Sequence, residues 1–311
     1  MRYLFLSLFA VFLFQIPNEK DFINYHQEYN NIEDLIVEEK FEEAEVLLNA
    51  LLISYSPPFA KDYVIAAEIC LLNNNNEQAT YWIKESIKKG VKVQCLKDID
   101  VFRDKLNNSD WSRLESDLMS LQTAYLSSIR IGLSKTIHRN YQKEQLSKKA
   151  KNYKGIVYSN FKKIKELLNE NTYPGENLIG IDNSDDASKI DDCSFDNSKI
   201  TVTLLHYTHP IYELTEEKLI EFIKKGSLHP REFAQIYTFE KNRISKLYKT
   251  SIKTGLIKSD YNFKFPFEKR KSDSQRVNKD RSNFGICSLE TDRKKTEIEE
   301  KYGIKLKFGY K

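Results

Sequence analysis

The stretch 41–52, FEEAEVLLNALL, recurs 35 residues later as 76–87, NEQATYWIKESI. Each copy has polar residues at its second and third positions and a small residue, Ala44 or Ala79, at its fourth, and then places apolar residues at the spacing of one helix face. A small residue lets two packed helices approach closely. The two copies therefore predict two equivalent helices, whose aligned apolar residues are Leu47 with Trp82, Leu48 with Ile83, and Leu52 with Ile87.

A second helix is expected before each copy, because an apolar pattern repeats there at the same offset. Its aligned residues are Ile32, Leu35 and Ile36 in the first copy, and Ala67, Cys70 and Leu71 in the second. Prolines at 57–58 and asparagines at 73–76 supply the turns. This order resembles tetratricopeptide repeats. The resemblance implies an α-α superhelix over residues 21–118, capped by 95–114, with a concave surface for a protein partner.

The beginning of the chain has the profile of a signal peptide at residues 1–18. Arg2 precedes an uncharged apolar run at 3–14, and Pro17 follows it. This run is shorter than the roughly 20 residues that cross a bilayer, and no later segment approaches that length. We expect an exported protein, periplasmic or extracellular, with no transmembrane span beyond this segment. The segment is either removed or kept as a membrane tether, and a buried N-terminal helix is the alternative.

Composition favours helices over the rest of the chain. Of 311 residues, 40% are hydrophobic and only ten are glycine and seven proline, too few turn formers for a sandwich or barrel. Acidic side chains prevail in 21–118 and basic ones in 119–311, within a formal net charge of +4. This asymmetry supports two modules divided near residue 118. A lysine-rich solvated surface explains the basic half more simply than nucleic acid does.

The second module, 119–311, is predicted to be a mostly helical domain. Apolar residues continue at helical spacing from Leu114 to Ile137, with Gly132 as the expected interruption. Further helices are expected around 157–168, after the N-cap Thr215, and from Pro230 onward. Residues 182–198 have the composition of a solvated loop. Residues 255–285 mix aromatic and charged side chains with glycine and proline, which predicts an irregular C-terminal arm.

Cysteines and charged clusters give no strong site. The four cysteines show neither C-x-x-C pairing nor metal-ligand spacing, so we expect no disulfide framework: Cys70, Cys95, Cys193 and Cys287. Aspartates at 182–196 lack the glycine and terminal glutamate of a calcium loop. Basic and aromatic residues at 261–281 have a composition that binds single strands, but export favours packing on the domain. We predict no cofactor and no nucleic-acid partner.

His206 and His209 are the closest approach to a chemical site. On a helix, two histidines three residues apart share a face, and zinc uses such pairs. A catalytic zinc site normally needs a third protein ligand, and the glutamate of an H-E-x-x-H motif is missing. We favour structural histidines, with a metal pair as the alternative.

Several short motifs follow one another between residues 140 and 290. They are Tyr173-Pro-Gly175, Leu178-Ile-Gly180, an apolar run ending in His206, 224–230 with Phe233-Ala234, Tyr248-Lys-Thr250, and Val277–Arg281 leading to Phe284-Gly-Ile286. Their order resembles a largely helical bacterial domain family of unknown function. The resemblance implies a helical fold and makes His206, Tyr248 and Arg281 the catalytic candidates. Two residue pairs of the family are replaced here by Thr238-Phe239 and Tyr141-Gln142, so a site built on them would be degenerate.

These features predict a mainly α protein with a short tetratricopeptide-like superhelix, a mostly helical domain and an irregular C-terminal arm. The first functional hypothesis is an interaction module that holds another protein in the cell envelope. The alternative is a metal-dependent or hydrolase-like enzyme centred on His206 and His209. It requires a pocket that gathers these histidines with Tyr248, Arg281 or an acid.

Overall fold

The computed structural model describes residues 21–181, 193–248 and 271–307, and these residues are mainly α-helical, as predicted. They form 15 helices and, within the same ranges, no strand. The predicted signal peptide at 1–18 lies outside the described residues, and so do the aspartates of 182–192. Within the described ranges, no helix combines the length and hydropathy needed to cross a membrane.

Four helices build the predicted repeats, and they follow the turns expected from the sequence. They are α1 (Phe22–Val37), α2 (Phe41–Tyr55), α3 (Ala60–Leu72) and α4 (Asn76–Lys88). Ala44 and Ala79 are fully buried, as close helix packing requires. The Asn73 side chain donates to the Phe41 carbonyl at 2.9 Å and thereby ties the turn before α4 to the start of α2.

One aligned pair of the repeats behaves differently from the prediction. Trp82 is 1% exposed, whereas its counterpart Leu47 is 47% exposed. The indole Nε1 donates to the Asn49 side chain at 2.6 Å, so Trp82 packs across onto α2. Leu47 lies on a side of α2 that the described residues leave largely uncovered, so these two aligned apolar residues are not buried alike.

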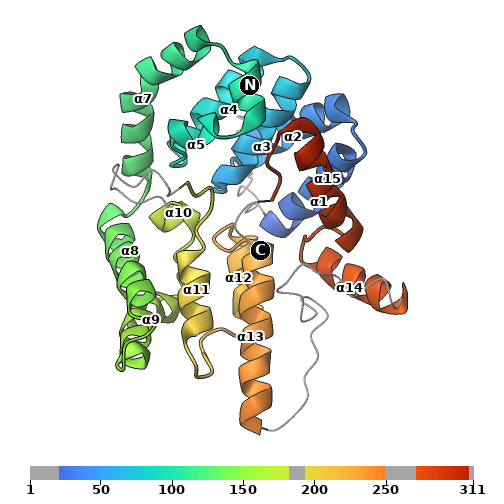
Figure 1. Cartoon of the computed structure of the whole chain (residues 1–311). Coiled ribbons are helices and arrows are strands. Elements are labelled where there is room, and N and C mark those ends of the chain that lie inside the picture. The colour runs from blue at the N-terminus through green and yellow to red at the C-terminus, as the bar shows by residue number, and fades with distance from the viewer. Residues whose placement is uncertain (1–20, 182–192, 249–270, 308–311) are drawn as a thin grey trace, which may run out of the picture.

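Three helices close the repeat array: α5 (Val93–Lys97), α6 (Asp100–Lys105) and the long α7 (Asn108–Ser128). A capping box between Asn107 and Asp110 starts α7. The chain then breaks at Ile129 and Arg130 instead of at Gly132, because the Arg130 amide donates to the Leu178 carbonyl at 2.8 Å. Figure 1 shows α7 descending from the repeats towards α8 (Ile131–Leu146).

The lower part of the molecule in Figure 1 has its own hydrophobic core. Besides α8, it contains α9 (Tyr153–Asn169), α10 (Glu176–Ile179), α11 (Lys199–His206), α12 (Glu216–Lys224) and α13 (Pro230–Tyr248). Thr215 caps α12 as predicted, since its hydroxyl accepts from the Lys218 amide. The buried Glu176 accepts from the Ala60 amide at 2.9 Å, and this bond joins α10 to the start of α3.

Residues 271–283 and 289–302 are helical, which corrects the prediction of an irregular arm over 255–285 for the part of it that the structure describes. They form α14 (Lys271–Asn283) and α15 (Leu289–Tyr302), and 249–270 lie outside the described residues. Figure 1 shows α15 beside α1, and Ile298, Ile304 and Leu306 join the hydrophobic core of the repeats. The packing cores therefore do not divide at residue 118, because the C-terminal segment returns to the first module.

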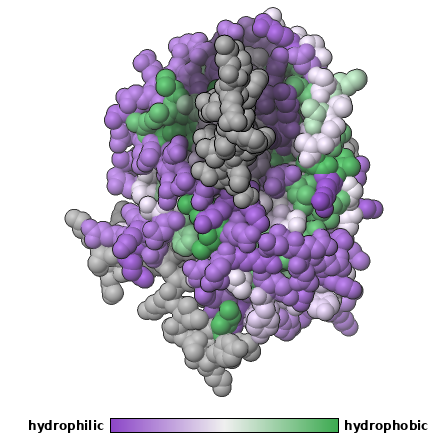
Figure 2. Space-filling view, turned by 180° about the vertical axis from the view of Figure 1, so that it is seen from behind, coloured by the Kyte–Doolittle hydropathy of each residue, from purple (hydrophilic) through white to green (hydrophobic). Residues whose placement is uncertain are grey.

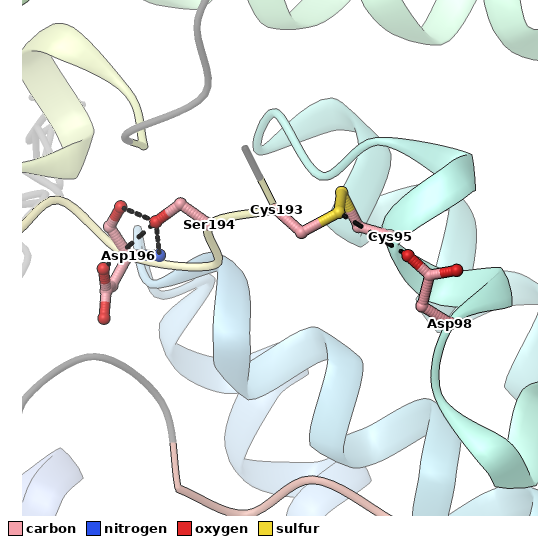
Figure 3. The surroundings of a disulfide bond; sticks show 5 residues. All are labelled: Cys95, Asp98, Cys193, Ser194 and Asp196. Atoms are coloured by element: carbon pink, nitrogen blue, oxygen red, sulfur yellow. Dashed lines mark hydrogen bonds between the residues drawn. A yellow bond between two sulfur atoms is a disulfide. The ribbon is translucent and has the colours of Figure 1, made fainter. Parts of the chain in front are cut away.

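One disulfide is present, although the cysteine spacing had indicated no disulfide framework. Cys95 of α5 is bonded to Cys193, which precedes α11 (Figure 3). The sequence separation of 98 residues hid this pair, because only the fold brings the two segments together. Cys70 and Cys287 are free and buried. Next to the disulfide, the Ser194 hydroxyl bonds to Asp196 in the same short segment (Figure 3).

Candidate functional site

A cavity of about 640 Å³ lies where the repeats meet the C-terminal helix. Its walls come from α1, from Lys61 at the start of α3, from His229 and Arg231 at the start of α13, from 285–287, and from α15 with 306–307. This volume falls in the range of small-molecule sites, roughly 300–1,000 Å³. Segments far apart in the sequence therefore converge on one hollow.

One face of α1 supplies polar side chains to this cavity. His26, Tyr29, Asn30 and Glu33 follow the i, i+3, i+4, i+7 spacing of a single helix stripe, and all four line the hollow. His26 and Tyr29 are each 4% exposed. A stripe of this kind normally carries apolar residues that face a core. On α1 the buried stripe carries polar side chains instead.

Asp292 is the centre of a buried ionic network in the cavity wall. Arg231 binds it with both terminal nitrogens, one at 3.0 Å, and Arg281 forms a further ion pair with it. Arg281 also donates to the Cys287 carbonyl at 2.6 Å. Burial alone would raise the pKa of Asp292, but the charges of Arg231, Arg281 and Lys295 outweigh it and hold that pKa well below its usual value. Asp292 is therefore a carboxylate near neutral pH.

Lys295 extends this network to the repeats. Its Nζ lies 2.5 Å from a Glu33 carboxylate oxygen and 3.6 Å from the Asp292 carboxylate. Burial acts to raise the pKa of Glu33, yet Lys295 and Arg231 lower it below the ordinary value. The ion pair between Glu33 of α1 and Lys295 of α15 therefore joins the two modules in the wall of the cavity.

Cys287 lies inside the same network. Its Sγ is 3.2 Å from both Arg231 Nη2 and Asp292 Oδ1, and 3.6 Å from Lys295 Nζ. Burial, followed by the charge of Glu33, raises the pKa of the thiol to about 12 despite the neighbouring cations. Cys287 is thus a thiol that donates to Asp292, and the cations are engaged by carboxylates.

A second ion pair lies at the α1–α3 end of the cavity. Lys61 Nζ is 2.5 Å from Asp62 Oδ1, and the Tyr25 hydroxyl donates to Asp62 Oδ2 at 2.6 Å. The ammonium also lies over the Tyr29 ring, 5.1 Å from its centroid. Both partners of the pair are buried, and of the two only Lys61 lines the hollow.

Two histidines stand between these ion pairs. The rings of His26 and His229 meet edge to face, with centroids 4.9 Å apart. Burial first, and then the charge of Lys61, lowers the pKa of each well below the ordinary value, and Arg231 and Lys295 add to this at His229. Both rings are therefore neutral at pH 7, and His229 Nδ1 accepts from the Arg231 amide at 3.2 Å.

Two buried polar atoms in the cavity wall are unsatisfied. His26 Nε2 and the Tyr29 hydroxyl have no hydrogen-bond partner among the described residues. Burial, and then the charges of Asp62 and Glu33, raise the pKa of Tyr29 well above its usual value, without Asp62 reaching hydrogen-bond geometry to its hydroxyl. Buried polar groups are nearly always paired, so these two atoms mark an incomplete site.

The residues predicted from the sequence do not gather in one place. Arg281 lies in the Asp292 network, whereas His206 Nδ1 is 2.5 Å from Glu144 Oε1 in the lower core. The ring of His209 packs near Tyr207. Tyr248 is the last residue of α13, and its side chain lies outside the described residues. No group of three or more histidine, cysteine, aspartate or glutamate residues in the described ranges is arranged to hold a metal.

Sequence reasoning missed the cavity because no local motif encodes it. Its residues come from segments that lie up to about 280 positions apart. One signal was present: α1 carries polar and titratable residues at the spacing of a buried face. A second was the pair Asp292 and Lys295 at i, i+3 on α15. Neither pattern indicates a site until the fold places the two helices side by side.

Comparison with known proteins gives no guide to this site. No protein-family model, no curated protein and no solved structure matches the chain. The candidate site is therefore defined by its geometry alone.

Proposed function

We propose that this chain is an exported helical protein that binds a small polar molecule in the cavity between α1 and α15. The observation that carries the proposal is the pair of unsatisfied polar atoms, His26 Nε2 and the Tyr29 hydroxyl, in the wall of a hollow of ligand size. An incoming molecule would supply the missing hydrogen bonds.

The ionic network supports the same proposal, because it is a costly way to stabilise a fold. Removing charges from water costs several kcal/mol per ion, and apolar packing of the same volume is often as stable or more so. Here Glu33, Arg231, Asp292 and Lys295 are charged and line one hollow. Titratable groups with shifted pKa values that converge in a cavity are typical of functional sites.

Export is part of the proposal, and the disulfide supports it. Disulfides persist in oxidising compartments and are rare in the cytosol of most cells. The Cys95–Cys193 bond agrees with the apolar N-terminal run of the sequence. Labelling of the denatured protein without reductant should modify two of the four cysteines, Cys70 and Cys287. Modification of all four cysteines would show that the Cys95–Cys193 bond does not form, and export would then lose this support.

The binding proposal is tested by closing the cavity at its mouth. Thr296 is an exposed residue of α15 that lines the hollow, so Thr296→Trp places a large ring at the entrance without disturbing the core. Thr123→Trp on the exposed side of α7 is the matched control. A panel of small polar metabolites is screened by thermal shift, and each hit is then titrated by calorimetry.

We expect at least one compound to bind the native chain and the Thr123→Trp variant, and to lose its affinity for Thr296→Trp. Two results contradict the proposal: no compound in the panel binds, or the bound compound is indifferent to Thr296→Trp.

A protein partner is the second candidate function, and exposed apolar side chains on α2 favour it. Val46, Leu47 and Ile53 are 67%, 47% and 64% exposed, and Val46 and Ile53 lie seven residues apart on one helix face. Figure 2 shows that one face of the molecule is mostly hydrophilic, with its hydrophobic side chains in separate patches. Exposed acids at Glu42 and Glu43 precede the strip. The fitting partner is an amphipathic segment with a basic edge.

This second candidate is tested with a photo-crosslinker placed at position 46, and with one at the exposed Tyr158 as control. A partner must crosslink at position 46 alone, rebind the purified chain, and lose that binding in Val46→Glu. Equal crosslinking at both positions would reject the strip as an interface.

A further inference from the structure

We infer that the ligand of the cavity carries an oxyanion, a carboxylate or a phosphate, which binds at the α1–α3 end to the Tyr29 hydroxyl, His26 Nε2 and the Lys61 ammonium. The inference deepens the proposed function and rests on it. It gives the chemical class of the ligand and says which end of the cavity binds its charged group.

The three groups are neighbours on two packed helices. His26 and Tyr29 are three residues apart on the same face of α1, and Lys61 Nζ from α3 lies 5.1 Å from the centroid of the Tyr29 ring. All three residues line the hollow and are more than nine-tenths buried. A single ligand group at this end of the cavity therefore meets them together.

Their hydrogen-bonding chemistry favours an acceptor. A tyrosine hydroxyl donates one hydrogen, and an ammonium carries three, of which the Asp62 contact uses one. The neutral His26 ring donates from Nε2 in one of its two tautomers. Carboxylate and phosphate oxygens accept several such bonds at once, and bonds to a charged acceptor are about twice as strong as neutral ones.

The charge of the surrounding wall favours an anion as well. Of the described side chains in the two buried networks, four are cations and three are carboxylates: Lys61, Arg231, Arg281 and Lys295 against Glu33, Asp62 and Asp292. At the rim, Arg293 pairs with Glu297, and both are exposed. A buried cation is stable when an opposite charge compensates it. An oxyanion balances the surplus, whereas a cationic ligand would add to it.

The neutral histidines fit this arrangement. The charge of Lys61 acts on both His26 and His229, and the charges of Arg231 and Lys295 act on His229 as well. An oxyanion beside them offsets the cations and lets a ring nitrogen donate. The site thus has donors, surplus positive charge and an unfilled volume in the same place.

The test removes one oxygen atom from the site. Tyr29→Phe deletes the unsatisfied hydroxyl and keeps the ring under Lys61. Tyr173→Phe is the matched control, because its buried hydroxyl also has no hydrogen-bond partner among the described residues and it packs in the other core. Inorganic phosphate, succinate and the uncharged glycerol are titrated by calorimetry into the full chain and both variants at constant pH and ionic strength.

We expect phosphate or succinate to bind the native chain, and glycerol not to bind. The affinity should fall about tenfold or more in Tyr29→Phe, as for the loss of one hydrogen bond to a charged group, and stay unchanged in Tyr173→Phe. His26→Phe should weaken the same probe independently. Preference for phosphate or for succinate identifies which oxyanion the site takes.

Two outcomes overturn the inference. One is that neither oxyanion binds. The other is that an oxyanion binds with equal affinity to the native chain, Tyr29→Phe and His26→Phe. If an uncharged compound binds and is lost in Thr296→Trp, the inference fails and the proposed binding function stands. If no compound binds in the cavity, the proposed function fails with it.

Discussion

Two histidine-containing regions of this molecule differ in how completely their polar groups are paired. In the lower core, His206 contacts the fully buried Glu144, and the second oxygen of that carboxylate accepts from Asn160 at 2.9 Å. In the cavity, His26 and His229 face cations, and His26 Nε2 and the Tyr29 hydroxyl are left unpaired. Around Glu144, both carboxylate oxygens and the His206 Nδ1 atom are paired. Among the described residues, the lower core leaves the Tyr173 hydroxyl unpaired, whereas the cavity has two unpaired polar atoms facing one hollow.

The difference teaches where a ligand belongs. A buried carboxylate whose two oxygens each meet a hydrogen-bonding partner satisfies the requirements of a folded interior. Such a carboxylate holds α8, α9 and α11 together and needs nothing further. The cavity has unpaired polar atoms, and one carboxylate, Asp292, contacts three cations. Leaving these groups without a ligand costs free energy, and a bound molecule would offset that cost. His206, which the sequence singled out, thus has a hydrogen-bond partner inside the fold.

The largest effect is expected from breaking the cavity network at its centre. Asp292→Ala leaves Arg231, Arg281 and Lys295 without their shared carboxylate, and a guanidinium does not lose its proton to compensate. We expect a loss of about 3–5 kcal/mol in the free energy of unfolding, measured with urea. Asp117→Ala, in a partly exposed pair with Lys84, is the control and should cost at most about 1 kcal/mol. Equal effects would mean that the network is not buried as described.

A smaller effect is expected from the corresponding change in the lower core. Glu144→Ala removes the partner of His206, but an imidazole is able to stay neutral. The remaining cost is that of unmade hydrogen bonds at His206 and Asn160, about 1–3 kcal/mol. The free energy of unfolding is measured in urea for Glu144→Ala and for a control, Glu166→Ala, which removes an exposed ion pair with Lys163. The difference between the two variants gives the cost of the unmade hydrogen bonds. A loss as large as that of Asp292→Ala would remove the contrast between the two regions.

The cavity histidines should make stability depend on pH with a definite sign. Because burial and Lys61 hold the pKa of His26 well below its ordinary value, the unfolded chain takes up a proton below about pH 6.5 and the folded chain does not. Stability is therefore lost as pH falls from 7.5 to 5.5. The buried Glu232 acts in the opposite sense, since burial raises its pKa and folding binds a proton there.

The histidine contribution is isolated by difference. The free energy of unfolding of His26→Phe relative to the native chain should rise by about 1 kcal/mol between pH 7.5 and pH 5.5, because the variant has no proton to exclude. Glu232 is present in both proteins and cancels. A difference that is constant with pH would show that His26 titrates alike in the folded and unfolded chains.

Much of the fold was predictable because helices are encoded locally. The repeat of 41–52 in 76–87, the Thr215 cap and the proline at 230 each depend on residues close in sequence. The helix at 271–283 was not predicted, because α14 has few apolar residues to mark a face. Local patterns also could not show that α15 packs against α1.

The candidate site was far less predictable, for the same physical reason. Glu33 and Lys295 form an ion pair across 262 positions, and Cys95 and Cys193 bond across 98. Such contacts depend on the packing of whole modules, and no spacing rule reports them. His206 was selected because a second histidine, His209, lies three residues away in the sequence. Two residues that are close in sequence need not belong to the same site. Arg281 was named from a resemblance, and the structure places it beside the cavity network.

The smallest effect concerns Cys287, and it tests whether the cations of the cavity are committed to carboxylates. Two cations lie within 3.6 Å of its sulfur and would favour a thiolate, whereas burial, Glu33 and Asp292 oppose one. With the pKa raised to about 12, almost no thiolate exists at pH 7.5. Alkylation of the native protein by iodoacetamide, followed by mass spectrometry, should leave Cys287 unmodified while the denatured chain reacts. Cys70, buried among apolar side chains, is the internal reference. Rapid alkylation of Cys287 alone would mean that Arg231 and Lys295 act on the sulfur, and the cavity would then hold a reactive nucleophile instead of a balanced network.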